Sequence, residues 1–114
     1  MKIILKGKPI STQHAYGQRG KIRYMKKVAK DLKKCYAEQA WEQWQSDALS
    51  CTLAIKIDIF FGDKRIRDWD NWHKISMDAL TGIVWDDDSQ IKKATVETHY
   101  CKENPRIEIE LSIH

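Results

Sequence analysis

Cysteine is scarce in this sequence, and its three cysteines form no C-x-x-C pair. Cys35, Cys51 and Cys101 are odd in number and widely spaced, which argues against a disulfide framework and favours reduced thiols. The four histidines are equally scattered, so the sequence contains no zinc-binding pattern. We therefore do not expect cross-links or a zinc site to hold the fold together.

Long hydrophobic runs are missing as well. No apolar segment approaches the roughly 18 residues that a membrane-spanning helix requires. The apolar block at residues 3–5 is too short for the core of a signal peptide, so we expect a cytoplasmic protein. Repeats, low-complexity tracts and linkers are also missing. Because 114 residues is the length of one domain, we expect a single domain over residues 1–114.

Charged residues, in contrast, make up 32% of the chain, with a formal net charge of +4. Lys and Arg dominate the front part, with few acids among residues 1–34, and the acids gather later. A basic front half beside a compact acidic cluster indicates a polyanionic partner together with a divalent cation. The alternative is a basic helix face that only meets solvent, and the charge pattern alone does not separate the two.

The hydrophobic pattern predicts an α+β protein. Residues 7–24 contain Gly and Pro and are expected to form a loop with a small hairpin turning at residues 18–20. The expected strands are residues 3–5, 51–61, 94–100 and 107–113, and the expected helices are residues 26–48 and 71–81, the second ended by Gly82. The order β–α–β–α–β–β predicts a small mixed sheet of about four strands with two helices packed on it.

The acids form two groups on either side of the second predicted helix. Asp68 and Asp70 can face one point, because residues i and i+2 of an extended chain point the same way. After the helix, a returning loop can bring Asp88 back towards this pair. Like charges about 4 Å apart repel by about 4 kcal/mol at an effective dielectric near 20, so a cation is expected between them. Oxygen ligands suit Mg²⁺ or Mn²⁺.

Lys74 stands one helical turn beyond Asp70, where it could contact a phosphate or stabilise charge developing on it. The alternative is a solvated turn, in which Asp70 caps the helix and Lys74 pairs with Asp70 or Asp78. The D-x-D pattern alone favours the solvated turn. The following Asn71, the lysine and a second acidic cluster in a basic protein together favour a metal site.

Other side chains near the motif have simpler expected roles. His73 should point away from the site, and Asp58 should pair with Lys56 on a polar strand face. Asp78 either supports Lys74 within the site or forms an ordinary i,i+4 salt bridge. Rather than base stacking, we expect packing in the core or at a subunit contact for Trp41 and Trp44, and packing around the site for Trp69 and Trp72.

The block RDWDNWHKISMDALTGIVWDDDSQI, residues 67–91, resembles the RusA family of Holliday-junction resolvases, which is common in phages and prophages. It matches the family pattern of Asp-x-Asp-Asn, a Lys three residues later, Asp-Ala-Leu, Gly-Ile, Asp-Asp and Gln-Ile. The segment GKPIS and the basic stretch after it resemble the front half of the family more loosely. The opening differs from the more usual P-P-S-x-N, since this chain has KPISTQHAY.

The resemblance implies Mg²⁺-dependent cleavage of four-way DNA junctions by a homodimer. The metal-binding aspartates of the family and its essential lysine correspond to Asp68, Asp70, Asp88 and Lys74. Asp88 is chosen because the final aspartate of the family stands two residues before the Gln. Asp86 is an additional acid in this run, and Asp87 stays open as an alternative third ligand. The metal is expected to be Mg²⁺, with Mn²⁺ as a second possibility.

The basic front half should then contact phosphates without reading sequence. The expected DNA-binding residues are Lys8, Arg19, Lys21, Arg23, Lys26, Lys27 and Arg67. A symmetric dimer could present two identical sites to two strands and make paired nicks, during DNA recombination and repair in a bacterial or phage-infected cell. Two alternatives remain: a nuclease for other branched phage DNA, and a junction-binding protein that does not cleave.

Overall fold

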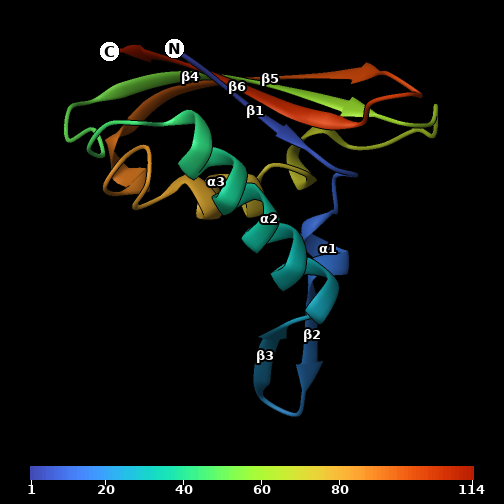
Figure 1. Ribbon diagram of the computed structural model, residues 1–114. Helices are drawn as coiled ribbons and strands as arrows, with labels where there is room; N and C mark the ends of the chain where they lie inside the picture. The colour runs from blue at the N-terminus through green and yellow to red at the C-terminus, as the bar shows by residue number, and fades with distance from the viewer.

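The computed structural model describes residues 1–114 and has the predicted α+β architecture (Figure 1). Four strands form a mixed sheet in the order β1-β6-β4-β5. β4 and β5 are parallel, and the other neighbouring strands are antiparallel. The strands of this sheet are β1 (Lys2–Lys6), β4 (Leu53–Phe61), β5 (Ile91–Tyr100) and β6 (Arg106–Ile113).

All helices lie on one face of the sheet, and the opposite face is bare (Figure 1). The α-helices are α1 (Thr12–Ala15), α2 (Lys27–Gln43) and α3 (Lys74–Leu80), and two short 3₁₀ helices are η1 (Trp69–Asn71) and η2 (Asp88–Gln90). None of the helices has the length and apolar character needed to cross a membrane. One face of the sheet is therefore free to carry polar side chains.

The core lies between the sheet and the helices, as the alternation in residues 51–61 predicts. Every second residue of β4 is buried, with 0–6% of its surface exposed: Leu53, Ile55, Ile57, Ile59 and Phe61. Tyr36 and Ala40 of α2 and Ile75 of α3 pack against this face. Burial of each large aliphatic side chain contributes about 1.5–3 kcal/mol, so this strand anchors the sheet.

Helix α2 is shorter than the pattern of residues 26–48 predicts. It ends at Gln43, and Trp44 takes an extended backbone while its indole N–H donates to the carbonyl of Asp47 at 3.1 Å. Val28 lies four residues before Leu32, at the spacing of a buried helical face, but is 57% exposed. The first turns of α2, which contain Val28, lie farther from the sheet than its C-terminal end (Figure 1).

The prediction of one helix over residues 71–81 was wrong at its start. The chain forms η1, then two residues outside both helices, Trp72 (φ −127°, ψ −2°) and His73, and only then α3. Trp72 instead packs edge-on against Phe61, with ring centroids 5.0 Å apart. Asp70 consequently lies inside η1 and does not cap α3. The end was predicted correctly, since Gly82 follows α3 with a φ of +89°.

The predicted hairpin is present as β2 (Tyr16–Arg19) and β3 (Ile22–Met25). Its turn contains Gly20 with a φ of +62°, a conformation that glycine adopts without a steric cost. The hairpin projects from the body of the molecule, beyond α1 (Figure 1). Helix α1 was not predicted, because only four residues form it and Ser11 caps them.

The bare face of the sheet carries an ion-pair group around Glu108. Its carboxylate lies 2.9 Å from Lys2 Nζ and 2.6 Å from Arg106 Nε. The hydrogen bond from Lys2, with that from Arg106, lowers the pKa of Glu108 below its ordinary value of 4.5. These contacts therefore stabilise the fold above that pH, and the stabilisation is lost as the pH falls through the lowered pKa.

We expect Glu108→Gln to lower the melting temperature near neutral pH. The difference from the unsubstituted protein should shrink as the pH falls below 4.5 and through the lowered pKa of Glu108, because the carboxylate is then protonated in both the folded and the unfolded state. Thermal unfolding at a series of pH values measures this. A difference that stayed constant down to the lowest pH would rule out ionisation of Glu108 as its cause.

Candidate functional site

A pocket of about 720 Å³ lies beneath β4 and β5, on the side of the sheet that carries the helices. Its apolar wall comes from the strands and includes Ile57 and Val96. Its polar wall comes mainly from η1, α3, η2 and the residue before α3, and includes Asp70, Asn71, His73, Lys74, Asp78 and Asp88, with Thr12 of α1. Asp88, which comes 18 residues after Asp70 in the sequence, therefore shares one cavity with Asp70 and Lys74.

Asp68 and Asp70 occupy one side of this site through η1. Asp68 stands at the start of η1 with an extended backbone, just outside the residues that line the pocket. Neither carboxylate forms an ion pair, whereas Asp58, Asp63 and Asp78 each do. The site thus contains acidic groups that no cationic side chain of the protein neutralises.

Asp88 accepts hydrogen bonds from two side chains that were not singled out from the sequence. Its Oδ1 accepts a hydrogen bond from the hydroxyl of Thr81 at 2.8 Å and from the indole N–H of Trp85 at 3.1 Å. Trp85 is fully buried, so its ring is fixed by the core. These contacts orient the carboxylate and leave Oδ2 free for another partner.

The side chain of Asp87 caps a helix, unlike that of Asp88. It begins η2 as part of a capping box, in which its Oδ2 accepts the backbone N–H of Ser89 at 3.1 Å. Its own backbone N–H donates to the side chain of Gln90 at 2.7 Å. The hydrogen bonds from Ser89 lower the pKa of Asp87. Asp87 does not line the pocket, whereas Asp88 does.

Lys74 pairs with Asp78 one turn further along α3, with Nζ 3.3 Å from Oδ2. It forms no ion pair with Asp70. Of the two partners considered from the sequence, Asp78 is therefore the one that Lys74 contacts. The side chain of Lys74 is 50% exposed and lines the pocket. Its ammonium group is therefore held in place and still reachable from solvent.

His73 lies at the pocket, although the sequence suggested that it points elsewhere. Burial lowers the pKa of its imidazole below 6.5, against a smaller raising effect of Asp70, and Lys74 lowers it further. Its Nδ1 is buried and has no hydrogen-bond partner. The imidazole is consequently neutral near pH 7 and leaves the charge of the nearby acids in place.

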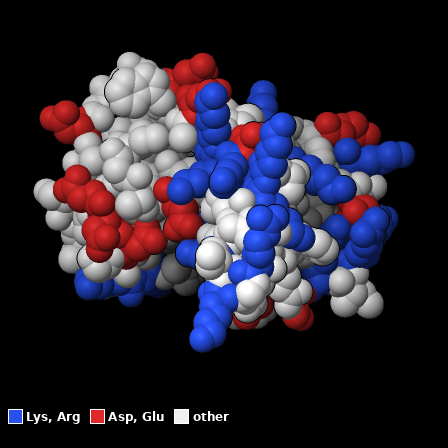
Figure 2. All heavy atoms as spheres, turned by 90° about the horizontal axis from the view of Figure 1, so that it is seen from below, with Lys and Arg blue, Asp and Glu red and all other residues white.

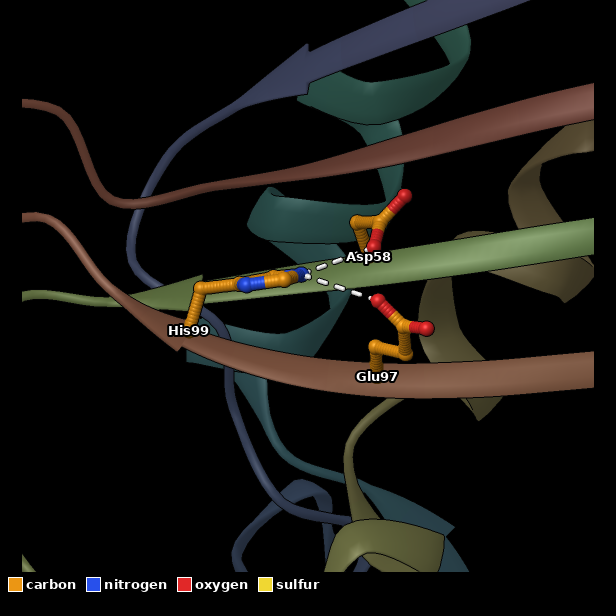
Figure 3. A group of neighbouring side chains, drawn as sticks. All are labelled: Asp58, Glu97 and His99. Carbon is orange, nitrogen blue, oxygen red and sulfur yellow. Dashed lines mark hydrogen bonds and ion pairs between the residues drawn. The ribbon is translucent and has the colours of Figure 1, made fainter.

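A second acidic group lies on the bare face of the sheet (Figure 3). Asp58, Glu97 and His99 are the only three His, Cys, Asp or Glu residues whose ligand atoms all lie within 4.8 Å of one another. His99 Nε2 is 2.7 Å from Asp58 Oδ1 and 3.8 Å from Glu97 Oε2. Lys56 also contacts Asp58 at 4.0 Å, as expected from the sequence. This group is a possible metal site that sequence reasoning missed.

The carboxylate oxygens of Asp68, Asp70 and Asp88, in contrast, do not all lie within 4.8 Å of one another. Asp88 is held by Trp85 on one side of the pocket, and η1 holds Asp70 on another. A cation shared by the three carboxylates would therefore have to draw their side chains together.

The basic residues expected to bind DNA are mostly exposed on the hairpin and at the start of α2. Figure 2 shows Lys and Arg side chains gathered over this end of the molecule, beside a group of acidic side chains. The exposed members are Lys8, Arg19, Lys21, Arg23, Lys26 and Lys27. Arg67 differs, because its guanidinium lies 4.2 Å from the centre of the Phe61 ring and 2.7 Å from Asp63.

The tryptophans fall into two pairs that differ in burial. Trp44 and Trp72 pack against the core, whereas Trp41 is 70% exposed and Trp69 is 60% exposed. Trp69 lines the pocket beside Asp70. Its exposed ring is a wall of the site and can contact a ligand.

A comparison with curated proteins finds no match to the chain. The family model described as endodeoxyribonuclease RusA matches residues 6–112, a span that includes the pocket, the hairpin and the whole acidic block. RusA proteins are endodeoxyribonucleases that resolve Holliday junctions. The chain therefore belongs to the RusA family of endodeoxyribonucleases.

Proposed function

We propose that this protein is a Mg²⁺-dependent endodeoxyribonuclease that resolves four-way DNA junctions by paired symmetric nicks. The observation that carries this proposal is the pocket that unites Asp70, Lys74 and Asp88 beside Asp68. An ordinary solvated turn does not require acids from both ends of this block to meet. Metal-assisted hydrolysis of a phosphodiester uses carboxylates that hold the metal, and a cationic side chain beside them stabilises charge on the phosphate.

The donor groups of the site fit Mg²⁺. Asp68 and Asp70 form no ion pair, and Asp88 has an oxygen that the contacts from Thr81 and Trp85 leave free. Carboxylate oxygens with water in the remaining positions are the ligands that Mg²⁺ prefers, and Mn²⁺ accepts the same set. When bound, the metal would supply activation of water and neutralisation of charge on the phosphate.

The side chains around the carboxylates then have separate roles. Lys74, kept in place by Asp78 at 3.3 Å, offers a point charge to the phosphate. Thr81 and Trp85 orient Asp88 through its Oδ1. The neutral His73 does not compete with a metal for the negative charge of Asp70. These groups position the phosphate and maintain the acidic character of the site.

The rest of the chain supplies the DNA contacts and the symmetry. The projecting hairpin and the start of α2 present exposed Lys and Arg residues to phosphates. Paired nicks in two strands require two equivalent sites, which a homodimer with two-fold symmetry provides. We propose that residues 1–114 act as one domain in each protomer.

A labelled synthetic four-way junction tests the proposal directly. With Mg²⁺ we expect nicks at symmetric positions in two opposing strands and no cleavage of a linear duplex of the same sequence. Binding without nicks in Mg²⁺ or Mn²⁺ would leave the non-cleaving junction-binding protein as the correct alternative. Faster cleavage of flaps or three-way branches would favour the nuclease for other branched DNA.

The support that Trp85 gives to Asp88 can be tested separately. Trp85→Phe removes the N–H that lies 3.1 Å from Asp88 and keeps an aromatic ring in the core. Loss of a side chain that orients a metal ligand typically lowers metal affinity or activity roughly 10- to 100-fold, and we expect that decrease here. Metal titration and junction cleavage measure it.

Trp44→Phe is the matched control for this substitution. Its indole N–H donates to a backbone carbonyl, that of Asp47, outside the pocket. We expect metal affinity and nicking to stay close to those of the unsubstituted protein. Equal losses in the two variants would show that general packing, and not the orientation of Asp88, explains the effect.

A further inference from the structure

We propose that a second pocket, adjacent to the acidic one, binds an unstacked nucleotide of the DNA, next to the phosphate that is cleaved. This inference rests on the proposed function, since it assigns the neighbouring subsite of the same substrate. The second pocket has a volume of about 860 Å³. It lies between the loop after β1, the first turns of α2 and the end of β4, with Lys8, Val28, Leu32, Phe61 and Trp72 among its walls.

The two pockets share one wall. Ser11 and Trp72 line the second pocket, and their chain neighbours Thr12 and Asn71 line the acidic one. The hydroxyl of Thr12 donates to the carbonyl of Asn71 at 3.3 Å and joins the two segments of this wall. A DNA strand that places a phosphate beside Asp70 therefore has the second pocket available for its next nucleotide.

The walls of the second pocket suit a base. Val28 and Leu32 form an apolar side, and Val28, in the part of α2 that lies away from the sheet, is 57% exposed. Phe61 and Trp72 form another side, where the guanidinium of Arg67 covers their rings at 4.2 and 5.3 Å from the ring centres, and Phe61 itself is only 6% exposed. A guanidinium plane supported by aromatic rings in this way stacks on any base, whatever its sequence.

The charges of the pocket indicate how the nucleotide is oriented. Lys8 is exposed and makes no ion pair, so it can contact a phosphate. Asp63 is already paired with Arg67 at 2.7 Å. Asp31 also lines the pocket without an ion pair, and its carboxylate repels a phosphate but accepts an N–H group of a base edge. The base therefore enters the pocket, and its phosphate stays at the rim with Lys8.

A stacked base pair cannot enter such a pocket, so the nucleotide must leave the helix first. Unstacking costs least where a base is already unpaired or poorly stacked, as at a branch point. The pocket therefore provides a physical reason for selecting branched over linear DNA. Neither the acidic site nor the basic hairpin provides this selection, since both contact phosphates that linear DNA also has.

The test uses four-way junctions with 2-aminopurine placed singly at each nucleotide beside the branch point, without divalent metal. We expect the protein to change the fluorescence of the probe at one position, where the base leaves the stack. Val28→Trp fills the pocket from its exposed wall and should abolish this change. Val28→Ala keeps the pocket open and should retain it.

Cys35→Trp is the matched control, because Cys35 lies two turns along the same face of α2, is exposed and does not line the pocket. It should retain the fluorescence change. With Mg²⁺, Val28→Trp should nick the junction about tenfold more slowly than Cys35→Trp, as expected for the loss of one stacked base. Both variants should melt close to the unsubstituted protein.

The outcomes separate this inference from the proposed function. A bound junction with no fluorescence change at any position, or a change that Val28→Trp retains, would overturn the nucleotide pocket even if nicking is normal. The expected fluorescence pattern without any nicking would support the pocket as a DNA-binding site and overturn the proposed nuclease.

Discussion

Asp70→Asn is expected to abolish junction nicking and to retain junction binding. Asn has the same shape but no charge, so it is a poor ligand for Mg²⁺. We expect a decrease of about a thousandfold, which corresponds to about 4 kcal/mol of activation free energy. Because Asp70 forms no ion pair, its replacement leaves no cationic side chain unpaired, and the melting temperature in metal-free buffer should not fall. Cleavage kinetics and a binding assay in Ca²⁺ measure the two parts.

Asp87→Asn is the matched control for Asp70→Asn. It removes the same charge from the same acidic block, but from a carboxylate that caps η2 outside the pocket. We expect some loss of thermal stability and nearly normal nicking. Unchanged nicking by Asp70→Asn, or an equally large loss in Asp87→Asn, would refute the assigned roles.

Neutralising the hairpin should have the second largest effect, on DNA binding. Arg19, Lys21 and Arg23 are exposed on β2, its turn and β3. Each phosphate contact contributes about 0.9 to the slope of log affinity against log salt, so the triple Gln variant should lose about 2.7 from that slope. Its affinity for the junction at low salt should fall about 100-fold. Fluorescence anisotropy over a range of salt concentrations measures both.

A triple variant of Lys92, Lys93 and Lys102 removes the same charge from exposed positions outside the hairpin. It should keep the slope and most of the affinity. If both triple variants lowered the affinity and the slope equally, the net charge of the protein and not the hairpin would explain DNA binding.

The sheet and much of the core could be predicted because their signals are local. The strict alternation in β4 needs only the period of an extended strand, and all five inward residues are buried. The Gly82 stop of α3 and the hairpin around Gly20 depend on backbone conformations that glycine favours. Tertiary packing overrode local pattern at Trp72, where contact with Phe61 accompanies a break in the predicted helix.

The candidate site could be predicted only in part, for the same reason. The spacing of the motif predicted that Asp70 and Lys74 belong to one site. Whether Asp87 or Asp88 is the better candidate for the third ligand depends on which carboxylate faces Trp85 and which caps η2. The group of Asp58, Glu97 and His99 depends on the parallel pairing of β4 with β5, in which Asp58 lies opposite Glu97. No local pattern contains that register.

The two acidic groups differ in the ligand atoms that they offer to a metal ion. The carboxylates of the pocket offer oxygen alone, whereas the group on the bare face includes an imidazole hydrogen-bonded to Asp58 and lies near Lys56. An ammonium group beside this second group already neutralises part of its charge. We therefore expect Mg²⁺ and Mn²⁺ to bind at the pocket.

Calorimetric titration with Mn²⁺ of Asp88→Asn and Glu97→Gln tests this central claim most directly. Each variant removes one negative charge, from the pocket and from the bare face respectively. The proposed site predicts that Asp88→Asn weakens binding at least about tenfold, through loss of one ligand, and that Glu97→Gln leaves it unchanged. Normal binding by Asp88→Asn, together with loss of binding in Glu97→Gln, would contradict it.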